Sequence, residues 1–385
     1  MPIYKMDGKK DGLQKYRVRI NYVDQFGKSK QLDRVAYGLD AAKQLERQLN
    51  YNLKSEITAK LTLEELYNEY IQVKKNEVRE TTIDKSKNLL ETFVLPDLKT
   101  YMLNKLNMHI LQQWKVKTEN LTTSTGKKFS LKYKRNIYGE FRTLLNYAVK
   151  MEYLEKNPLS KLGTFKDTGE IKKKMDYYTS DEFIKFINIG YKEACDYEQK
   201  TGSINEWNYY VFFNIAFYTG MRKGEIYALR WSDINNDIIS VTRSIAQKLK
   251  GGDRETPPKN KSSIRSLQMP KPLIKVIKEH YSRFKQIDGF TDDWRICGGQ
   301  ICIRDSTLEK RCKLYAEKAG IKKIRIHDFR HSHATLLANN AINIQEIARR
   351  LGHSNIEITW NVYSHLYPQE SERAINILNK IENNV

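Results

Sequence analysis

The chain has 385 residues, of which 40% are hydrophobic, so it is long enough for two or three domains with ordinary cores. No apolar run approaches the roughly 18 residues of a membrane helix, and the N-terminus lacks the apolar core of a signal peptide. Both observations argue against a membrane or exported protein and favour the cytoplasm. The formal net charge is +21, with an excess of 6 positive charges in residues 1–60, 5 in 61–170 and 10 in 171–385. Because every segment is basic, the sequence favours domains that each contact a polyanion, usually DNA, over a charge kept for solubility.

The first 57 residues are predicted to form a small domain of one sheet and one helix. Residues 16–22 alternate apolar and polar side chains, which indicates a half-buried strand. A hairpin turn at 24–28, a second strand at 29–35 and a helix at 40–54 are expected to follow. A basic face on a narrow sheet suits insertion into a DNA groove, although an ordinary hairpin subdomain is the alternative. The candidate DNA contacts here are Arg17, Arg19 and Lys28.

Residues 58–165 are predicted to form an all-helical domain. Thr62 and Glu65 make a capping-box pattern that starts a helix, and further helices are expected at about 81–95, 107–119 and 130–150. Basic residues cluster where the last of these helices begins, a position that favours phosphate, although such clusters are usually solvated faces. These candidate DNA contacts are Lys127, Lys128, Lys132, Lys134 and Arg135. The charged segment 166–174 is predicted to be a linker.

Residues 175–385 are predicted to form a mostly helical domain with one small sheet. A second capping box, at 179–182, starts it, and the apolar stretch 207–218 is expected to be a core helix. Strands are expected at 238–247 and 262–269, joined by a mobile hairpin rich in Gly, Pro and Lys. From 305 onward the pattern is helical, with interruptions at Gly352 and Pro368. The fold class is therefore mainly α with small β-sheets (α+β).

Histidines gather near the C-terminal end of the chain: five of the seven lie between 327 and 365. A metal site is disfavoured because His327, His331 and His333 cannot share one helix face, and no matching Cys or carboxylate pair accompanies them. A structural histidine cluster and phosphate chemistry are the other two interpretations, the latter using His327 and Arg330 on one helix face. The cysteines form no C-x-x-C pair and are expected to be free thiols: Cys195, Cys297, Cys302 and Cys312.

Four short motifs, taken together, resemble the tyrosine recombinase family, which includes phage integrases, Xer-type enzymes and conjugative-transposon integrases. They are TGMR at 219–222, HDFRHS at 327–332, LGH at 351–353 and NVYSH at 361–365. Each motif alone is modest evidence, but their order over about 145 residues is specific. The resemblance implies an arm-type DNA-binding domain at 1–57, a core-binding domain at 58–165 and a catalytic domain at 175–385. The sheet domain, which Xer-type enzymes lack, favours an integrase of a phage or conjugative transposon.

The resemblance also implies a mechanism. Tyr363 would attack a DNA phosphate and form a 3′-phosphotyrosine, while Arg222 and Arg330 neutralise the nonbridging oxygens. His327 and His353 would add hydrogen bonds, and His327 is a candidate to accept the tyrosine proton. Lys259, with Lys261 as the second choice, would protonate the leaving 5′ oxygen. Glu225 would be a structural ion partner, and neither ATP nor a metal or other cofactor is expected.

Further expectations follow from the same resemblance. Four protomers would assemble on double-stranded DNA with core and arm sites and exchange strands through a Holliday junction, in the nucleoid of a bacterial cytoplasm. An excisionase and DNA-bending proteins are candidate accessory partners. The tail after Tyr363 would pack on a neighbouring subunit or equally on its own domain. A type IB topoisomerase and a non-catalytic DNA-binding regulator are the alternative functions. Tyr367 is a less favoured alternative nucleophile.

Overall fold

The computed structural model describes residues 3–23, 29–58, 61–166, 175–247, 252–256 and 261–364, together with 375–376 and 378–379. The chain divides into two compact units, Met1–Ile171 and Lys172–Val385. In the described part of the chain, no helix combines the length and the apolar character needed to cross a membrane. The predicted turn at 24–28 and nearly all of the predicted linker lie outside the described residues.

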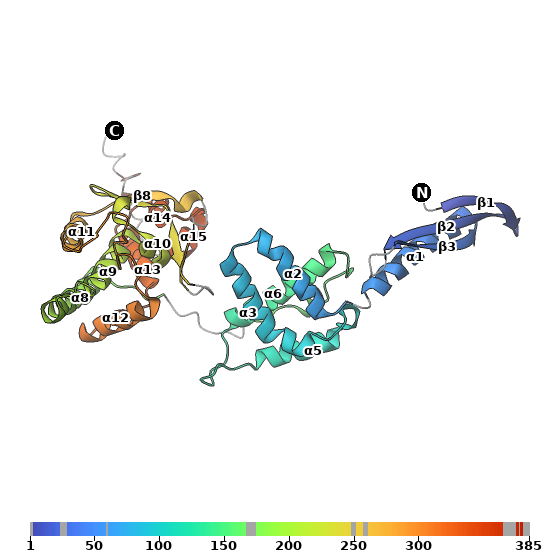
Figure 1. Cartoon of the computed structure of the whole chain (residues 1–385), viewed down its shortest axis with the longest axis horizontal. Coiled ribbons are helices and arrows are strands. Elements are labelled where there is room, and N and C mark those ends of the chain that lie inside the picture. The colour runs from blue at the N-terminus through green and yellow to red at the C-terminus, as the bar shows by residue number, and fades with distance from the viewer. Residues whose placement is uncertain are drawn as a thin grey trace. The chain divides into compact units, whose positions relative to one another are not determined.

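The N-terminal sheet has three antiparallel strands in the order β1 (Ile3–Lys10), β2 (Leu13–Val23) and β3 (Ser29–Tyr37). The predicted alternation is confirmed, since Val18 and Ile20 are buried between more exposed neighbours. Helix α1 (Leu39–Thr58) packs on the sheet (Figure 1). Its Ala42 joins Val18 and Ala36 in a small core. Strand β1 was not predicted, because its charged and mostly exposed sequence carries no period of two.

The following helices bury their apolar faces in one core around Leu66, Trp114 and Phe141. The predicted capping box is confirmed: Thr62 Oγ1 accepts from the Glu65 amide, and the Glu65 carboxylate accepts from the Thr62 amide at 2.8 Å. The predicted helix at 81–95 is too long, because the first helix ends at Phe93 and a short second one contains a proline in its first turn. The elements are α2 (Leu63–Glu77), α3 (Glu80–Phe93), α4 (Leu95–Leu98), η1 (Leu103–Lys105), α5 (Met108–Glu119), α6 (Leu131–Lys150) and α7 (Leu159–Leu162).

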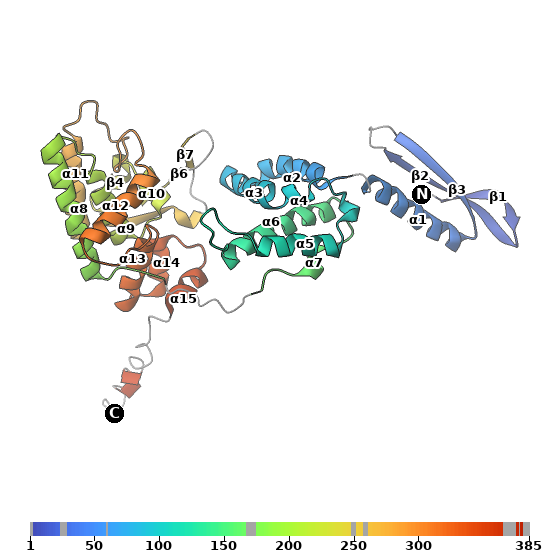
Figure 2. The same ribbon diagram turned by 90° about the horizontal axis from the view of Figure 1, so that it is seen from below.

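The second unit is built around α9 (Trp207–Thr219), which is apolar on every side and buried along nearly its whole length, as predicted. Aromatic rings from neighbouring helices pack on it; the rings of Phe183 and Phe217, for example, stack with centroids 3.7 Å apart. Helices α13, α14 and α15 pack against one another, and α13 packs on α9 (Figures 1 and 2). The other helices are α8 (Ser180–Thr201), α10 (Lys223–Ala228), α11 (Lys271–Phe284), α12 (Asp305–Lys318), α13 (Asp328–Asn339), α14 (Ile344–Leu351) and α15 (Ile356–Tyr363).

The described strands of this unit form two small sheets, whereas one was predicted. β4 (Ile234–Asn235), β5 (Ile238–Val241) and β8 (Arg265–Gln268) make an antiparallel sheet, and β6 (Ser244–Ala246) pairs with β7 (Arg254–Thr256) as a separate ribbon (Figure 2). The single strand predicted at 238–247 is therefore wrong, because the pairing changes partner between β5 and β6. The strand predicted at 262–269 is shorter in the structure. It begins only at Arg265, after a 3₁₀ turn (η3, Lys261–Ser263). A further 3₁₀ turn, η2 (Trp231–Asp233), precedes β4.

Candidate active site

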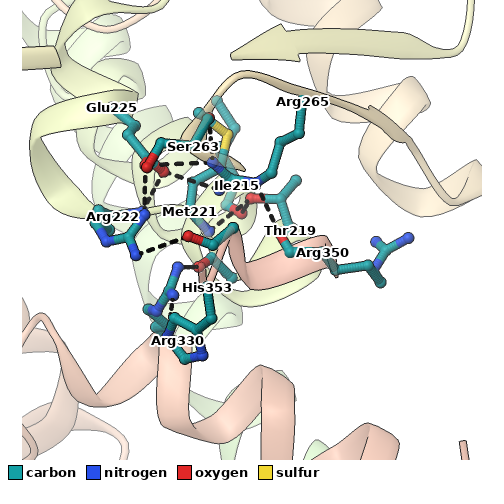
Figure 3. Close-up of polar contacts among 12 residues, drawn as sticks. Ile215, Thr219, Met221, Arg222, Glu225, Ser263, Arg265, Arg330, Arg350 and His353 are labelled. Carbon is teal, nitrogen blue, oxygen red and sulfur yellow. Dashed lines mark hydrogen bonds and ion pairs between the residues drawn. The ribbon is translucent and has the colours of Figure 1, made fainter. Parts of the chain in front are cut away.

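Arg222 sits at the junction between α9 and α10. Gly220 ends α9 in the left-handed conformation with φ of 64°, and a Cβ there would lie 2.7 Å from the ring of His333. Only glycine fits this close approach. The chain then turns so that Arg222 caps α10: its amide donates to Glu225 Oε2, and its Nη1 donates to Glu225 Oε1, both at 2.9 Å. Arg222 Nη2 also donates to the Gly352 carbonyl at 3.1 Å, so the first arginine contacts the loop that carries His353 (Figure 3).

Arg265, which no sequence motif singled out, lies behind Arg222. Its guanidinium is buried and donates to both carboxylate oxygens of Glu225, at 3.2 and 2.8 Å. It also donates to the carbonyls of Arg350, at 2.7 Å, and of Ser263, at 3.0 Å (Figure 3). One side chain thus connects the Arg222 turn, the last turn of α14 and the 3₁₀ turn before β8. The signal in the sequence is an arginine at an inward position of a strand, two residues before the buried Leu267.

The charges at this site have the balance expected of an anion-binding site. Burial alone would raise the pKa of the Glu225 carboxyl, but the hydrogen bond and charge of Arg265 and the charge of Arg222 outweigh it and lower that pKa. Glu225 is therefore ionised and holds its arginines. Burial, followed by repulsion from Arg222, lowers the pKa of Arg330 to about 9. A bound phosphate would relieve this repulsion, since it places negative charge between the two arginines.

Arg330 and His353 meet from different helices. Arg330 lies in the first turn of α13, is 4% exposed, and donates from Nη1 to the Gly220 carbonyl at 2.8 Å. Its Nη2 lies 2.7 Å from His353 Nε2 (Figure 3). A guanidinium can only donate, so His353 Nε2 accepts and the ring proton is on Nδ1, which donates to Thr359 Oγ1 at 2.8 Å. Burial and the charges of Arg330 and Arg222 lower the pKa of His353 to about 4, which agrees with a neutral ring.

Tyr363 is the last residue of α15 and is 3% exposed. Its side chain packs with Ala334, Ala338 and Leu351 of the two preceding helices. Its hydroxyl lies 2.6 Å from Nδ1 of His331. Burial raises the pKa of Tyr363, while the positive charge of Arg330 acts in the opposite direction. The phenol is therefore protonated in this state, and it needs a proton acceptor and nearby positive charge before it can attack.

The structure brings some of the predicted catalytic residues into contact and leaves others apart. Arg222, Arg330 and His353 are joined through the hydrogen bonds given above, and the charge of Arg330 reaches Tyr363. His327 caps α13 and meets His331 edge to face, with ring centroids 5.2 Å apart. Burial and the charge of His331 lower the pKa of His327 to about 4. The partner of the Tyr363 hydroxyl is His331, one helical turn beyond the histidine predicted from the sequence as the proton acceptor.

Several candidates lie outside the described residues, among them Lys259, Tyr367 and Lys28; the tail after Tyr363 is described only at 364, 375–376 and 378–379. The second-choice lysine, Lys261, begins the 3₁₀ turn before β8. Within the described part of the chain, no group of three or more His, Cys, Asp or Glu side chains is placed to hold a metal ion. The four cysteines are free thiols, and all but Cys195 are buried.

The candidate DNA contacts of the first unit lie on two elements. Arg17 and Arg19 project from β2, and Arg19 pairs with Asp33 of the neighbouring strand at 2.9 Å. The other five surround the start of α6, whose N-cap is Ser130. Lys127 and Lys128 are exposed in the turn before this cap, and Lys132 is exposed in the first helical turn. Lys134 is half-buried, and Arg135 donates to the Phe165 carbonyl at 3.0 Å.

Comparison with known proteins gives matches to both units. Residues 191–370 match the Phage integrase family, and residues 62–137 match the N-terminal SAM-like domain of phage integrases. A XerC-like tyrosine recombinase of Caldanaerobacter subterraneus subsp. tengcongensis is 32% identical over 269 residues, which cover 62% of this chain and 64% of the relative. The ICEBs1 integrase of Bacillus subtilis is 28% identical over 253 residues, which cover 64% and 65% of the two chains. The chain thus matches slightly less than two thirds of the length of these curated relatives.

Solved structures resemble the chain as well. The Tn1549 transposon integrase, in complex with transposon right end DNA, aligns with a TM-score of 0.63 and 20% identity over 83% of this chain and 100% of that chain. A lambda integrase tetramer bound to a Holliday junction aligns with a TM-score of 0.54 and 14% identity over 93% and 94% of the two chains. At these identities the likeness establishes a shared fold.

Proposed function

The chain belongs to the phage integrase family of tyrosine recombinases, and on this basis we propose that it is a site-specific DNA recombinase that integrates and excises a mobile element. The observation that carries the proposal is the convergence of Arg222, Arg330 and His353 at one site, with Tyr363 buried within reach of the charge of Arg330. Two fixed guanidinium groups and a protonated phenol are the groups that transesterification of a phosphodiester requires.

The reaction proceeds in two transesterifications. Arg222 and Arg330 bind the nonbridging oxygens of the scissile phosphate as fixed forks, and His327 and His353 add hydrogen bonds. The phenolic oxygen of Tyr363 gives up its proton, for which His327 is the acceptor predicted from the sequence, and bonds to phosphorus while the bond to the 5′ oxygen breaks. Lys259 gives that oxygen a proton. The product is a 3′-phosphotyrosine and a free 5′-hydroxyl, which conserves the phosphodiester energy, and a 5′-hydroxyl from the partner duplex then displaces Tyr363.

The remaining parts of the chain hold the DNA. Residues 1–57 act as an arm-type DNA-binding domain through Arg17, Arg19 and Lys28, and residues 58–165 act as the core-binding domain. The basic residues around the start of α6 contact the phosphates of the core site: Lys127, Lys128, Lys132, Lys134 and Arg135. The segment 166–174 links this domain to the catalytic domain, 175–385. Four protomers assemble on two core sites and pass through a Holliday junction, with an excisionase and DNA-bending proteins as candidate partners.

The reaction is tested on a nicked DNA substrate that carries the element's end sequence. After cleavage, the short fragment with the new 5′-hydroxyl diffuses away, so the covalent adduct accumulates. The protein is expected to form an SDS-resistant adduct with the 3′ phosphate, and Tyr363→Phe is expected to abolish it while DNA binding persists. Tyr281→Phe removes a hydroxyl that is bonded to Asp292, away from the four motifs, and serves as the matched control. An adduct that survives in Tyr363→Phe would move the nucleophile to Tyr367 or elsewhere.

Two further readouts separate the alternative functions. Relaxation of a supercoiled plasmid with no strand exchange between two matched sites would favour a type IB topoisomerase. DNA binding with no adduct, across several salt concentrations, would favour a non-catalytic regulator. For the core-binding domain, Lys127→Ala and Lys132→Ala are each expected to make the slope of log affinity against log salt shallower, by roughly 0.9 for each phosphate that the variant no longer neutralises.

A further inference from the structure

The histidine that touches the nucleophile has no role in the reaction scheme so far. His331 lies on α13 directly after Arg330, and its Nδ1 is 2.6 Å from the Tyr363 hydroxyl. This is a short distance for a hydrogen bond between a ring nitrogen and a hydroxyl, and it joins two helices through residues that are separated by 32 positions in the sequence. His327, by contrast, meets His331 edge to face, and the contact between them is one of rings.

We propose that His331 is the general base of the reaction, accepting the phenolic proton of Tyr363 through Nδ1 when the oxygen attacks phosphorus. The proposal rests on the recombinase function proposed above. His327 then keeps its hydrogen bond to the phosphate oxygens, and His331 takes the proton of the nucleophile.

The step balances without any added reagent. The O–H bond of Tyr363 breaks, its proton bonds to His331 Nδ1, and its oxygen bonds to phosphorus while the 5′ oxygen leaves. His331 is then an imidazolium. In the rejoining step the incoming 5′-hydroxyl gives its proton back to Lys259 as it displaces Tyr363, and His331 returns its own added proton to the phenolate. By microscopic reversibility one residue serves both directions.

The protonation states of the two residues suit this role. Burial raises the pKa of Tyr363, so the phenol has a proton to donate. Burial, opposed by the charge of Asp328, lowers the pKa of His331, so the ring is neutral near pH 7 and Nδ1 can accept. The ring proton of neutral His331 is then on Nε2. The titratable and charged groups around His331 are Asp328 and Arg330 on its own helix, Arg325 and His327 just before it, His353 after α14 and Tyr363 from α15.

Substrate binding would make His331 a stronger base at the right moment. The positive charge of Arg330 is one of the causes that lower the pKa of His331. A phosphate bound to Arg330 offsets that charge, so the imidazolium becomes easier to form only when DNA occupies the site. The proton therefore stays on Tyr363 in the free protein, and His331 becomes able to accept it during the attack only when DNA occupies the site.

The experiment measures the rate of single-turnover adduct formation on the nicked substrate, with the full-length chain. His331→Gln keeps a hydrogen-bond acceptor for Tyr363 but cannot take its proton, and we expect a rate lower by roughly 10²- to 10⁴-fold. In the wild type the rate should fall once His331 becomes protonated, and because burial lowers the pKa of His331, this should happen at a pH below the value of about 6.5 for an ordinary histidine. In His331→Gln this acid limb should shift or disappear, and the rate should rise with pH, by up to about tenfold per unit, as hydroxide replaces the missing base. A misfolded variant would not be rescued in this way.

A substrate with a 5′-bridging sulfur distinguishes the base from the acid, because a thiolate leaves without a proton. The defect of His331→Gln should persist on this substrate, and that of Lys259→Ala should shrink. His109→Gln, on an exposed residue of α5, is the control for histidine removal in general.

The outcomes separate the two proposals. No adduct from the wild type contradicts the recombinase function and this inference with it. If the wild type and His331→Gln form the adduct equally fast, the recombinase function stands and the role of His331 is overturned. The same holds if the acid limb of the pH profile disappears in His327→Gln instead of in His331→Gln.

Discussion

Arg265 and Glu225 form a buried ion pair, with Nη2 of the arginine 2.8 Å from Oε2 of the glutamate and both side chains at most 5% exposed. The same carboxylate receives the Arg222 side chain, so Glu225 fixes one arginine that faces the site and one that lies behind it. Arg265 in turn reaches the carbonyl of Arg350, three residues before His353. We therefore expect the position of the phosphate-binding groups to depend on a residue that does not itself contact phosphate.

Arg265→Lys tests this dependence. Lysine keeps the charge but lacks the planar fork, so it cannot hold Glu225 and two carbonyls at once. We expect adduct formation to slow by roughly 10- to 100-fold, as when other orienting residues are removed, while the affinity for DNA changes little. Arg304→Lys, in an exposed ion pair with Asp253, is the matched control and should be close to wild type. An equal loss of DNA binding and adduct formation in Arg265→Lys would point to a folding defect instead.

Thr359 holds the ring of His353 from behind. Its buried hydroxyl is the partner of His353 Nδ1 at 2.8 Å. Thr359→Val removes that hydroxyl at nearly constant volume and leaves a ring N–H without its partner, at a cost of about 1–3 kcal/mol. We expect adduct formation to slow about tenfold and its pH profile to change as the histidine tautomers become free to exchange. Thr118→Val removes a buried hydroxyl that bonds to the Trp114 carbonyl of its own helix, and should leave the rate unchanged.

Gly220 is required both for its backbone conformation and for space. Gly220→Ala adds the strain of a left-handed alanine, about 1–2 kcal/mol, and places Cβ 2.7 Å from His333 and 2.9 Å from Leu351. Gly202→Ala has nearly the same φ, 68° against 64°, with nothing within 4 Å, so it isolates the strain. Thermal unfolding should show a clearly larger drop in Tm for Gly220→Ala. Equal drops would mean that the site relaxes around the added methyl.

Acid should destabilise the second compact unit below about pH 6.5. Burial is the main cause that lowers the pKa of five histidines, with values of about 3 for His280 and His333 and about 4 for His327 and His353; the fifth is His331. Because the folded pKa values lie below that of an unfolded histidine, the unfolded chain binds more protons in this window. The stability is therefore complete above about pH 6.5 and is lost as the pH falls toward roughly 3–4.

Each such histidine contributes a slope of up to about 1.4 kcal/mol per pH unit to the free energy of unfolding. Denaturant unfolding of the full chain at about pH 7.5, 6 and 5 measures the total. His280→Gln should reduce the slope by the share of one proton, since its buried ring bonds the Ile296 carbonyl outside the active site. His109→Gln should not. A stability that is flat across this pH range would contradict neutral buried histidines.

Local patterns in the sequence determined much of this protein. The capping boxes at Thr62 and Thr179, the apolar α9 and the alternation in β2 are confirmed, because each depends on residues within a few positions of one another. The four motifs identified the positions at which Arg222, Arg330, His353 and Tyr363 were expected to act, and the first three of these are joined by contacts in the structure. The roles assigned to them, to Lys259 and to the DNA-contacting residues remain predictions.

Only the tertiary structure decided which side chains support these groups. Arg265 meets Glu225 across 40 residues, His331 meets Tyr363 across 32, and Thr359 meets His353 where a loop returns to a helix. No local sequence pattern indicates the partners of these three residues, which are an arginine in a short strand, a second histidine one turn after the first and a buried threonine. Arg265 and His331 meet their partners because packing brings distant segments within hydrogen-bonding distance, and Thr359 meets His353 because the chain turns back over six residues. Sequence periodicity reports which face of a helix is buried but not which residue it will meet.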